Sequence, residues 1–340
     1  PHRPPYTVWL AEMMLQQTQT ATVIPYYREF LSRYPTVLDL ARADRKEILG
    51  LWAGLGYYRR AHLLHDAARI VAEEHDGQFP QEVADLLKLP GVGRYTAGAI
   101  ASIAFDRRAP ILDGNVKRVL ARLTASEASP DDPGEIRRLW QLAEDILPAR
   151  NCGAFNEALM DLGATVCMPK NPNCAACPLA AECTARLRDM VDRIPPPRKR
   201  AKVQTLELVC CLVIGGADGQ HILVGARPPR GLWAGAWTPP AQAVNGASGS
   251  TLLAQLVPAA IARRMPAPTT LGTVRHQLTH RAVEFTVLTG AVARIRLPAQ
   301  YRWHRRDDLR ALPTAFRKVV ELLDTQPVYP RSSAQVFGVS

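Results

Sequence analysis

Three consecutive prolines followed by a basic run interrupt this chain between residues 194 and 204. Proline cannot continue a helix and a dense run of lysine and arginine cannot be buried, so residues 194–204 are predicted to be an interdomain linker. Before the linker, from residue 6 to about 190, apolar side chains recur at helical spacing, and no convincing period-two run appears. Residues 1–193 are therefore predicted to form an all-α domain.

After the linker the pattern changes to β-branched and alternating residues, which is typical of strands. We expect an α+β domain over residues 205–324. The tail, residues 325–340, has no periodicity and is assigned no element. The expected elements are strands at 206–214, 221–225 and 281–288 and a closing helix at 307–323.

Composition limits the class of protein. With 47% hydrophobic and 21% charged residues among 340, the chain can bury cores, and global disorder is excluded. No apolar run approaches the roughly 18 to 20 residues of a membrane helix. Residues 1–5 contain no apolar signal region and no initiating methionine, so a few residues are expected to precede them. We expect a cytoplasmic, nucleoid-associated protein that does not bind membranes.

The positive charge is concentrated in the second half of the chain. Of the net charge of +11, residues 1–193 carry −1, the linker +4 and residues 205–340 +8. A polyanion such as nucleic acid is the natural partner of such a surface. The alternative is a basic surface that serves only solubility.

The segment from Leu89 to Gly98 contains two glycines, Gly91 and Gly93, separated by Val92 and followed by small residues. Such a turn at a helix N-terminus points backbone N–H groups outward and binds phosphate without sequence preference. An ordinary turn between two helices uses the same residues. The segment is thus a candidate DNA contact on weak evidence.

Four of the seven cysteines, at positions 167, 174, 177 and 183, have the spacing C-x6-C-x2-C-x5-C. Four thiolates this close can enclose one metal centre, either a [4Fe–4S] cluster or zinc. The crowding argues against a secreted disulfide framework. The other cysteines are expected in the cores.

Two carboxylates stand out by their context. Glu12 shares a helical stripe with apolar residues, and burial there would raise its pKa towards that of a general acid. A structural glutamate is the alternative. Asp113 precedes a helix at an N-cap position, where aspartate is usually structural.

Taken together and in order, these motifs resemble the helix-hairpin-helix DNA glycosylases, specifically the MutY-type adenine DNA glycosylases. The resemblance covers nearly the whole chain. It implies a [4Fe–4S] cluster on Cys167, Cys174, Cys177 and Cys183, and favours iron over zinc. The motifs that carry it are residues 11–20, 54–58, 89–98 and 111–118 and the cysteine spacing.

The family removes adenine mispaired with 8-oxoguanine or guanine in duplex DNA, and the resemblance implies roles for matching residues. Glu12 matches the acid that protonates adenine N7. Asp113 matches the carboxylate that stabilises the sugar cation. The other matched residues are Tyr95 and Asn115 at the site and Gln17 and Tyr57 in the base stack.

Tyr95 follows the hairpin arginine, where the related glycosylase/lyases have a Schiff-base lysine. The resemblance therefore implies a monofunctional glycosylase. Lys117 is nearby in sequence, and weak lyase activity through its amine is the alternative.

The second domain resembles the Nudix-like domain of the same family through residues 231–237 and 275–280. Nudix hydrolases need clustered glutamates to hold Mg²⁺. Between Glu207 and Glu284 there is no glutamate, so we expect a recognition domain in place of a hydrolase. Thr279 and His280 are the candidate contacts to 8-oxoguanine, with a purely structural β-turn as the alternative.

The expected function is thus excision of adenine by a monomeric glycosylase. Two rivals are a thymine or uracil mismatch glycosylase of the same superfamily and a non-catalytic DNA-binding iron–sulfur protein.

Overall fold

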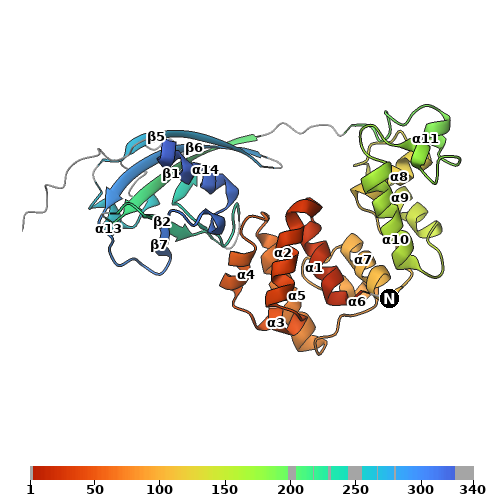
Figure 1. Cartoon of the computed structure of the whole chain (residues 1–340), viewed down its shortest axis with the longest axis horizontal. Helices are drawn as coiled ribbons and strands as arrows, with labels where there is room; N and C mark the ends of the chain where they lie inside the picture. Colours follow the sequence, from red (N-terminus) through yellow and green to blue (C-terminus); the bar gives the residue numbers. More distant parts are fainter. Residues whose placement is uncertain are drawn as a thin grey trace, which may run out of the picture. The chain divides into compact units, whose positions relative to one another are not determined.

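The computed structural model describes residues 3–197, 204–216, 218–228, 231–243, 255–265, 267–278 and 281–325. The chain divides into two compact units, residues 1–51 with 59–200 and residues 52–58 with 201–340. The first is helical and the second is built on a β-sheet (Figure 1). No helix in the described parts is long and apolar enough to cross a membrane.

The helical unit has no strand among residues 3–197, as the sequence predicted. Its elements are α1 (Pro5–Leu15), α2 (Thr20–Arg33), α3 (Val37–Arg42), α4 (Arg45–Leu51), α5 (Arg59–Glu74), α6 (Val83–Leu86), α7 (Arg94–Phe105), α8 (Gly114–Leu123), α9 (Pro133–Asp145), α10 (Cys152–Asp161), the π-helical turn η1 (Leu162–Val166), the 3₁₀ turn η2 (Cys174–Ala176) and α11 (Thr184–Leu187).

Helix α7 is the central element of this unit, because every residue from Thr96 to Ala104 is buried. Its small side chains let α1 and α10 pack against it. At Gly98 another backbone segment lies directly against α7. A Cβ there would lie 2.3 Å from the carbonyl oxygen of Pro110, on the segment that leads to Asp113.

We therefore expect Gly98→Ala to destabilise the helical unit by about 1 to 3 kcal/mol, because the methyl group would displace the backbone at Pro110. The measurement is the urea midpoint of the helical circular dichroism signal. The matched control is Gly50→Ala in α4, where nothing lies within 4 Å of the new Cβ. The Gly50→Ala variant should unfold at the wild-type urea midpoint or above it, since alanine is a better helix former than glycine. Equal midpoints for both variants would contradict the prediction.

The second unit contains a seven-stranded mixed sheet with the order β3-β2-β1-β6-β5, in which β4 pairs with β1 and β7 with β2. The long strands β1 and β6 are parallel, and the other pairs are antiparallel. The bounds are β1 (Gln204–Gly215), β2 (His221–Ala226), β3 (Trp237–Thr238), β4 (Ala241–Ala243), β5 (Thr269–Gln277), β6 (Arg281–Val292) and β7 (Tyr301–Arg305), with α13 (Ala259–Ala262) and α14 (Thr314–Thr325).

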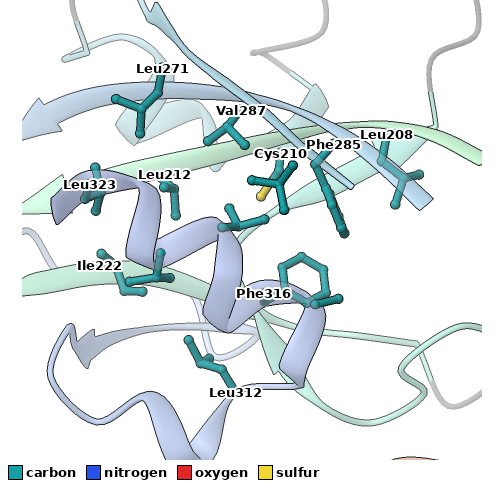
Figure 2. Packing of buried hydrophobic residues seen from close by; sticks show 14 of the residues in the cluster. Leu208, Cys210, Leu212, Ile222, Leu271, Phe285, Val287, Leu312, Phe316 and Leu323 are labelled. Carbon is teal, nitrogen blue, oxygen red and sulfur yellow. The ribbon is translucent and has the colours of Figure 1, made fainter. Parts of the chain in front are cut away.

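Both faces of β1 are buried, so adjacent cysteines enter different cores. Cys210 packs with Phe285 and with Phe316 of α14 in the core shown in Figure 2. Cys211 packs on the opposite face with Ile261 of α13. Two helix-covered faces give the α+β architecture that the sequence predicted.

The predicted closing helix at 307–323 is wrong at its start, because α14 begins only at Thr314. Residues 309–311 form a short 3₁₀ turn instead. Leu312 is extended, with φ −100° and ψ 145°. Pro313 follows it, and a residue before proline is sterically excluded from the helical region, so the two segments cannot join.

Candidate active site

Glu12 is buried on α1, with 7% of its surface exposed. Loss of hydration raises the pKa of its carboxyl to about 7, and negative charge at Asp113 and Glu157 contributes in the same direction. A hydrogen bond with Tyr95 opposes this rise. Near neutral pH both protonation states of Glu12 are therefore populated.

The Tyr95 hydroxyl connects this glutamate to α10. Its oxygen lies 3.3 Å from Met160 Sδ and also within hydrogen-bonding reach of the Glu12 carboxyl, and its single proton is donated to one of the two at a time. Burial and the two nearby carboxylates raise the pKa of Tyr95, which stays protonated. Glu157, also on α10, pairs with Arg3 at 2.8 Å. Helices α1, α7 and α10 thus meet around one buried acid.

Asp113 is the N-cap of α8, as predicted, and its Oδ1 accepts a hydrogen bond from the backbone N–H of Val116 at 2.7 Å. Burial raises the pKa of Asp113, whereas the N–H groups of Val116 and Asn115 and the Arg118 charge favour its ionised form. Its charge in turn acts on Glu12. The capping role of Asp113 therefore coexists with an electrostatic effect on Glu12.

Arg118 holds the start of α8 against the chain that follows α10. This side chain is 9% exposed, and its guanidinium donates to Asn115 Oδ1 (2.9 Å), Gly163 O (2.7 Å) and Cys167 O (2.8 Å). A Cβ at Gly163 would lie 2.6 Å from Asn115 Cβ, so only glycine permits this approach. The π-helical turn Leu162–Val166 brings Gly163 there.

A cavity of about 440 Å³ adjoins this end of α8. Asp113, Asn115 and Lys117 line one side, and residues 194–197 of the predicted linker line another. Ile194 is 1% exposed, and its carbonyl accepts a hydrogen bond from Arg122 Nε at 2.8 Å. The described start of the predicted linker thus packs on the helical unit.

The four predicted metal ligands, Cys167, Cys174, Cys177 and Cys183, line one small cavity together with Arg122. Arg122 is 2% exposed and donates to Cys167 Sγ at 3.3 Å. Burial and the other three thiols raise the pKa of Cys174. Within the described ranges, no three Cys, His, Asp or Glu side chains form a group that could hold a single metal ion. The remaining cysteines are buried in the cores, as predicted.

The predicted hairpin lies between α6 and α7. Gly91 has a φ of +78°, and Gly93 is the N-cap of α7, where no side chain caps the helix. Val92 is buried, whereas Gly93 is exposed. The Gln16 amide donates to Gly91 O at 3.3 Å and ties the hairpin to the end of α1.

The two residues that the resemblance places in the base stack share an unusual backbone conformation. Gln17 has a φ of +59° and Tyr57 of +50°, and both side chains are exposed. Residues with side chains rarely adopt this left-handed conformation, which costs about 1 kcal/mol or more and clusters at functional sites. Arg60 holds the loop of Gln17, since it donates to Met14 O (2.7 Å) and Thr18 Oγ1 (2.9 Å).

Comparisons with known proteins identify the family of the chain. Residues 10–145 match the model of the HhH-GPD superfamily base excision DNA repair protein, and residues 210–322 match the NUDIX domain. The adenine DNA glycosylases of Homo sapiens and Rattus norvegicus are both 36% identical over 94% of this chain, which covers 68% and 72% of their lengths. The chain belongs to the adenine DNA glycosylase family. The Arabidopsis thaliana member is 38% identical, over 71% of this chain and 43% of its own length.

Among solved structures, a thermostable thymine-DNA glycosylase is similar to this adenine DNA glycosylase family member. It is 31% identical with a TM-score of 0.50, and the match covers 55% of this chain and 86% of that one.

In this family member the structure adds residues that sequence reasoning missed, namely Glu157, Met160, Arg60, Arg118 and Arg122. The i, i+4 spacing of Arg118 and Arg122 on α8 was the one available signal, because it places both arginines on the same side of the helix. Thr279 and His280 lie outside the described residues. They connect β5 to β6, whose ends pair at Gln277 and Ala282.

Proposed function

We propose that this chain hydrolyses the N-glycosidic bond of adenine mispaired with 8-oxoguanine or guanine in duplex DNA. The observation that carries the proposal is the pair of carboxyl groups: Glu12 has a pKa of about 7, and Asp113, whose charge acts on Glu12, is fixed at the start of α8 by its N-cap bond. Two carboxyl groups in different environments can hold opposite protonation states at one pH.

In this proposal Glu12 supplies a proton to N7 of the extruded adenine, which makes the base a better leaving group. Asp113 opposes the positive charge that develops on the sugar as the bond breaks. Water then completes hydrolysis. Both steps need the carboxyl groups to be fixed, which the Tyr95 hydroxyl does for Glu12 and the Val116 N–H does for Asp113.

The proposed enzyme is monofunctional, because Tyr95 offers no amine at the position where the related lyases have lysine. Lys117 lines the same cavity as Asp113, so its amine is the one whose role as a lyase nucleophile has to be excluded. Borohydride trapping on abasic DNA makes the distinction, since efficient cross-linking would show that a lysine acts as a nucleophile.

We further propose that the four cysteines around the Arg122 cavity hold a [4Fe–4S] cluster. Their common cavity and the family membership support this assignment. When bound, the cluster would cross-link residues 167–183 through four iron–thiolate bonds. We expect purified protein to absorb near 400 nm and to contain about four irons per chain. Metal analysis that finds one zinc and no iron would contradict the assignment.

Recognition of the opposite base is proposed for Thr279 and His280. The basic excess of residues 205–340, 15 Lys and Arg against 7 Asp and Glu, supports a DNA-facing role for the second unit.

The deciding experiment incubates the protein with duplexes that contain A:8-oxoguanine, A:G, T:G or U:G and then cleaves abasic sites with alkali. We expect breakage of the adenine strand alone. The T:G duplex tests the second candidate, a thymine glycosylase. This candidate is included because the chain is also similar to a solved thymine-DNA glycosylase. Breakage at thymine would favour it, and no breakage would favour the non-catalytic rival.

Tyr95→Phe tests the acid role through pH. The hydrogen bond from Tyr95 lowers the pKa of Glu12, so its removal should raise that pKa above its present value of about 7. Because the protonated acid is the active form, the pH at which excision falls to half its maximum should move upward. Single-turnover excision between pH 6 and 9 measures it. Tyr6→Phe, a buried tyrosine on the same helix that donates to Tyr34 O, is the matched control. A downward shift in Tyr95→Phe would be contrary to the assignment.

A further inference from the structure

The thioether sulfur of Met160 lies next to the buried acid but has no role in the proposed reaction. Met160 is a partly buried residue near the end of α10, and its Sδ lies 3.3 Å from the Tyr95 oxygen. The same hydroxyl is within hydrogen-bonding reach of the Glu12 carboxyl. One phenol therefore faces two acceptors of different strength, since a thioether accepts hydrogen bonds only weakly.

The chemistry of the phenol decides which of the two acceptors it serves. A tyrosine hydroxyl has one proton to donate, and its oxygen can also accept a hydrogen bond. When Glu12 is ionised, its carboxylate is the stronger acceptor, because a hydrogen bond to a charged group is about twice as strong as one between neutral groups. In that state the Tyr95 proton points to Glu12 and the sulfur of Met160 receives none.

Protonation of Glu12 changes the direction of this hydrogen bond. The neutral carboxyl carries a proton of its own, which it can donate to the Tyr95 oxygen. The tyrosine proton then needs another acceptor, and Met160 Sδ lies within reach at 3.3 Å. A partly buried donor that lacks an acceptor costs free energy, so the sulfur stabilises the arrangement in which Glu12 is protonated.

We propose that Met160 is a positioning residue for the acid step: it accepts the Tyr95 proton when Glu12 is protonated, and so favours the proton-donating form of the acid. The inference rests on the proposed function, because it takes Glu12 as the acid. Met160 acts only through Tyr95 in this role, so its effect should appear in the pH dependence of excision.

The other charged and titratable groups around Glu12 act from separate elements. Asp113, before α8, and Glu157, on α10, raise the pKa of Glu12 through their negative charge. Arg60 of α5 donates to backbone carbonyl groups in the last turn of α1, and Tyr27 of α2 donates to a carbonyl in its first turn. A substitution of the thioether leaves all four groups in place, so a change in the titration of Glu12 reports on the tyrosine hydroxyl.

Met160→Leu removes the acceptor at similar volume, so the protein should remain folded. Without an acceptor for the Tyr95 proton, the protonated form of Glu12 loses support, and its pKa should fall by about half a unit to one unit. The alkaline limb of single-turnover excision should move to lower pH by the same amount, opposite to the shift expected for Tyr95→Phe. The matched control is Met190→Leu, a partly buried methionine packed beside α11, which should leave the limb in place.

The double variant with both Tyr95→Phe and Met160→Leu separates this role from packing. If Met160 acts through the hydroxyl, Met160→Leu should cause no further shift once residue 95 is phenylalanine, because the proton that the sulfur accepts is gone. A shift of equal size in both backgrounds, or no shift in the wild-type background, would overturn the proposal.

Infrared difference spectra between pH 5 and 9 make the test independent of excision. The carbonyl band of the protonated Glu12 carboxyl, identified by its absence in Glu12→Gln, should disappear at lower pH in Met160→Leu than in the wild type. A protein that shows this shift but does not excise adenine would reject the proposed function and support the role of Met160. Excision that depends on Glu12, together with an unchanged band in Met160→Leu, would reject the role of Met160 alone.

Discussion

Asp113→Asn should reduce single-turnover excision of adenine by about 10²-fold or more while the protein stays folded and still binds mispaired DNA. The substitution removes the negative charge that opposes the sugar cation. It leaves an amide oxygen able to accept the N–H of Val116, the bond that caps α8 at 2.7 Å. Since asparagine caps helices about as well as aspartate, stability should change little.

The chain provides a matched control for this substitution. Asp132 caps α9 in the same way, with the Glu135 N–H at 2.8 Å. Asp132→Asn should leave both excision and stability near wild type. If Asp113→Asn excises adenine as fast as this control, Asp113 is only a cap and the proposed electrostatic role is lost.

Glu12→Gln should be inactive as well, because an amide cannot supply a proton. General acid catalysis is worth about 10² to 10⁴-fold, which sets the expected loss. In the wild type the sign of the pH dependence follows from the raised pKa of about 7. Excision should be maximal below that pH and fall about tenfold per unit above it, as the proton is lost.

Glu157→Gln tests whether the pH dependence of excision comes from titration of Glu12. The Glu157 charge raises the pKa of Glu12, so its removal should shift the alkaline limb of the profile to lower pH and leave the maximal rate unchanged. Single-turnover assays from pH 5 to 9 record both quantities. An active Glu12→Gln enzyme with the wild-type profile would reject Glu12 as the acid.

Local patterns were sufficient for much of the fold. Apolar spacing predicted a helical first part, and alternation in Val283, Phe285 and Val287 predicted one buried face of β6. Asp113 could be assigned as a cap because capping depends on residues adjacent in sequence. The start of α14 was missed, although Pro313 carried the signal.

Contacts between distant segments could not be predicted in this way. Arginines such as Arg118 and Arg122 are expected on a solvated helix face. Both are nevertheless buried, and they donate to carbonyl groups of residues 163–169 and 194. One partner of Tyr95 is Met160, 65 residues later on α10. The catalytic roles proposed for Glu12 and Asp113 came from the family resemblance, because periodicity alone favoured structural ones.

Three glycines of the helical unit lie where another part of the chain approaches their Cα closely, and this predicts how substitutions there would act. Gly98, Gly153 and Gly163 each leave less than 3 Å for a Cβ, at Pro110 O, Ser102 O and Asn115 Cβ. Substitutions at these positions should therefore act by lowering the amount of folded enzyme, whereas substitutions of the carboxylates should act on the site itself. Lower temperature or a stabilising ligand should restore activity to a glycine variant. Neither treatment should restore activity to a variant that has lost one of the two carboxylates.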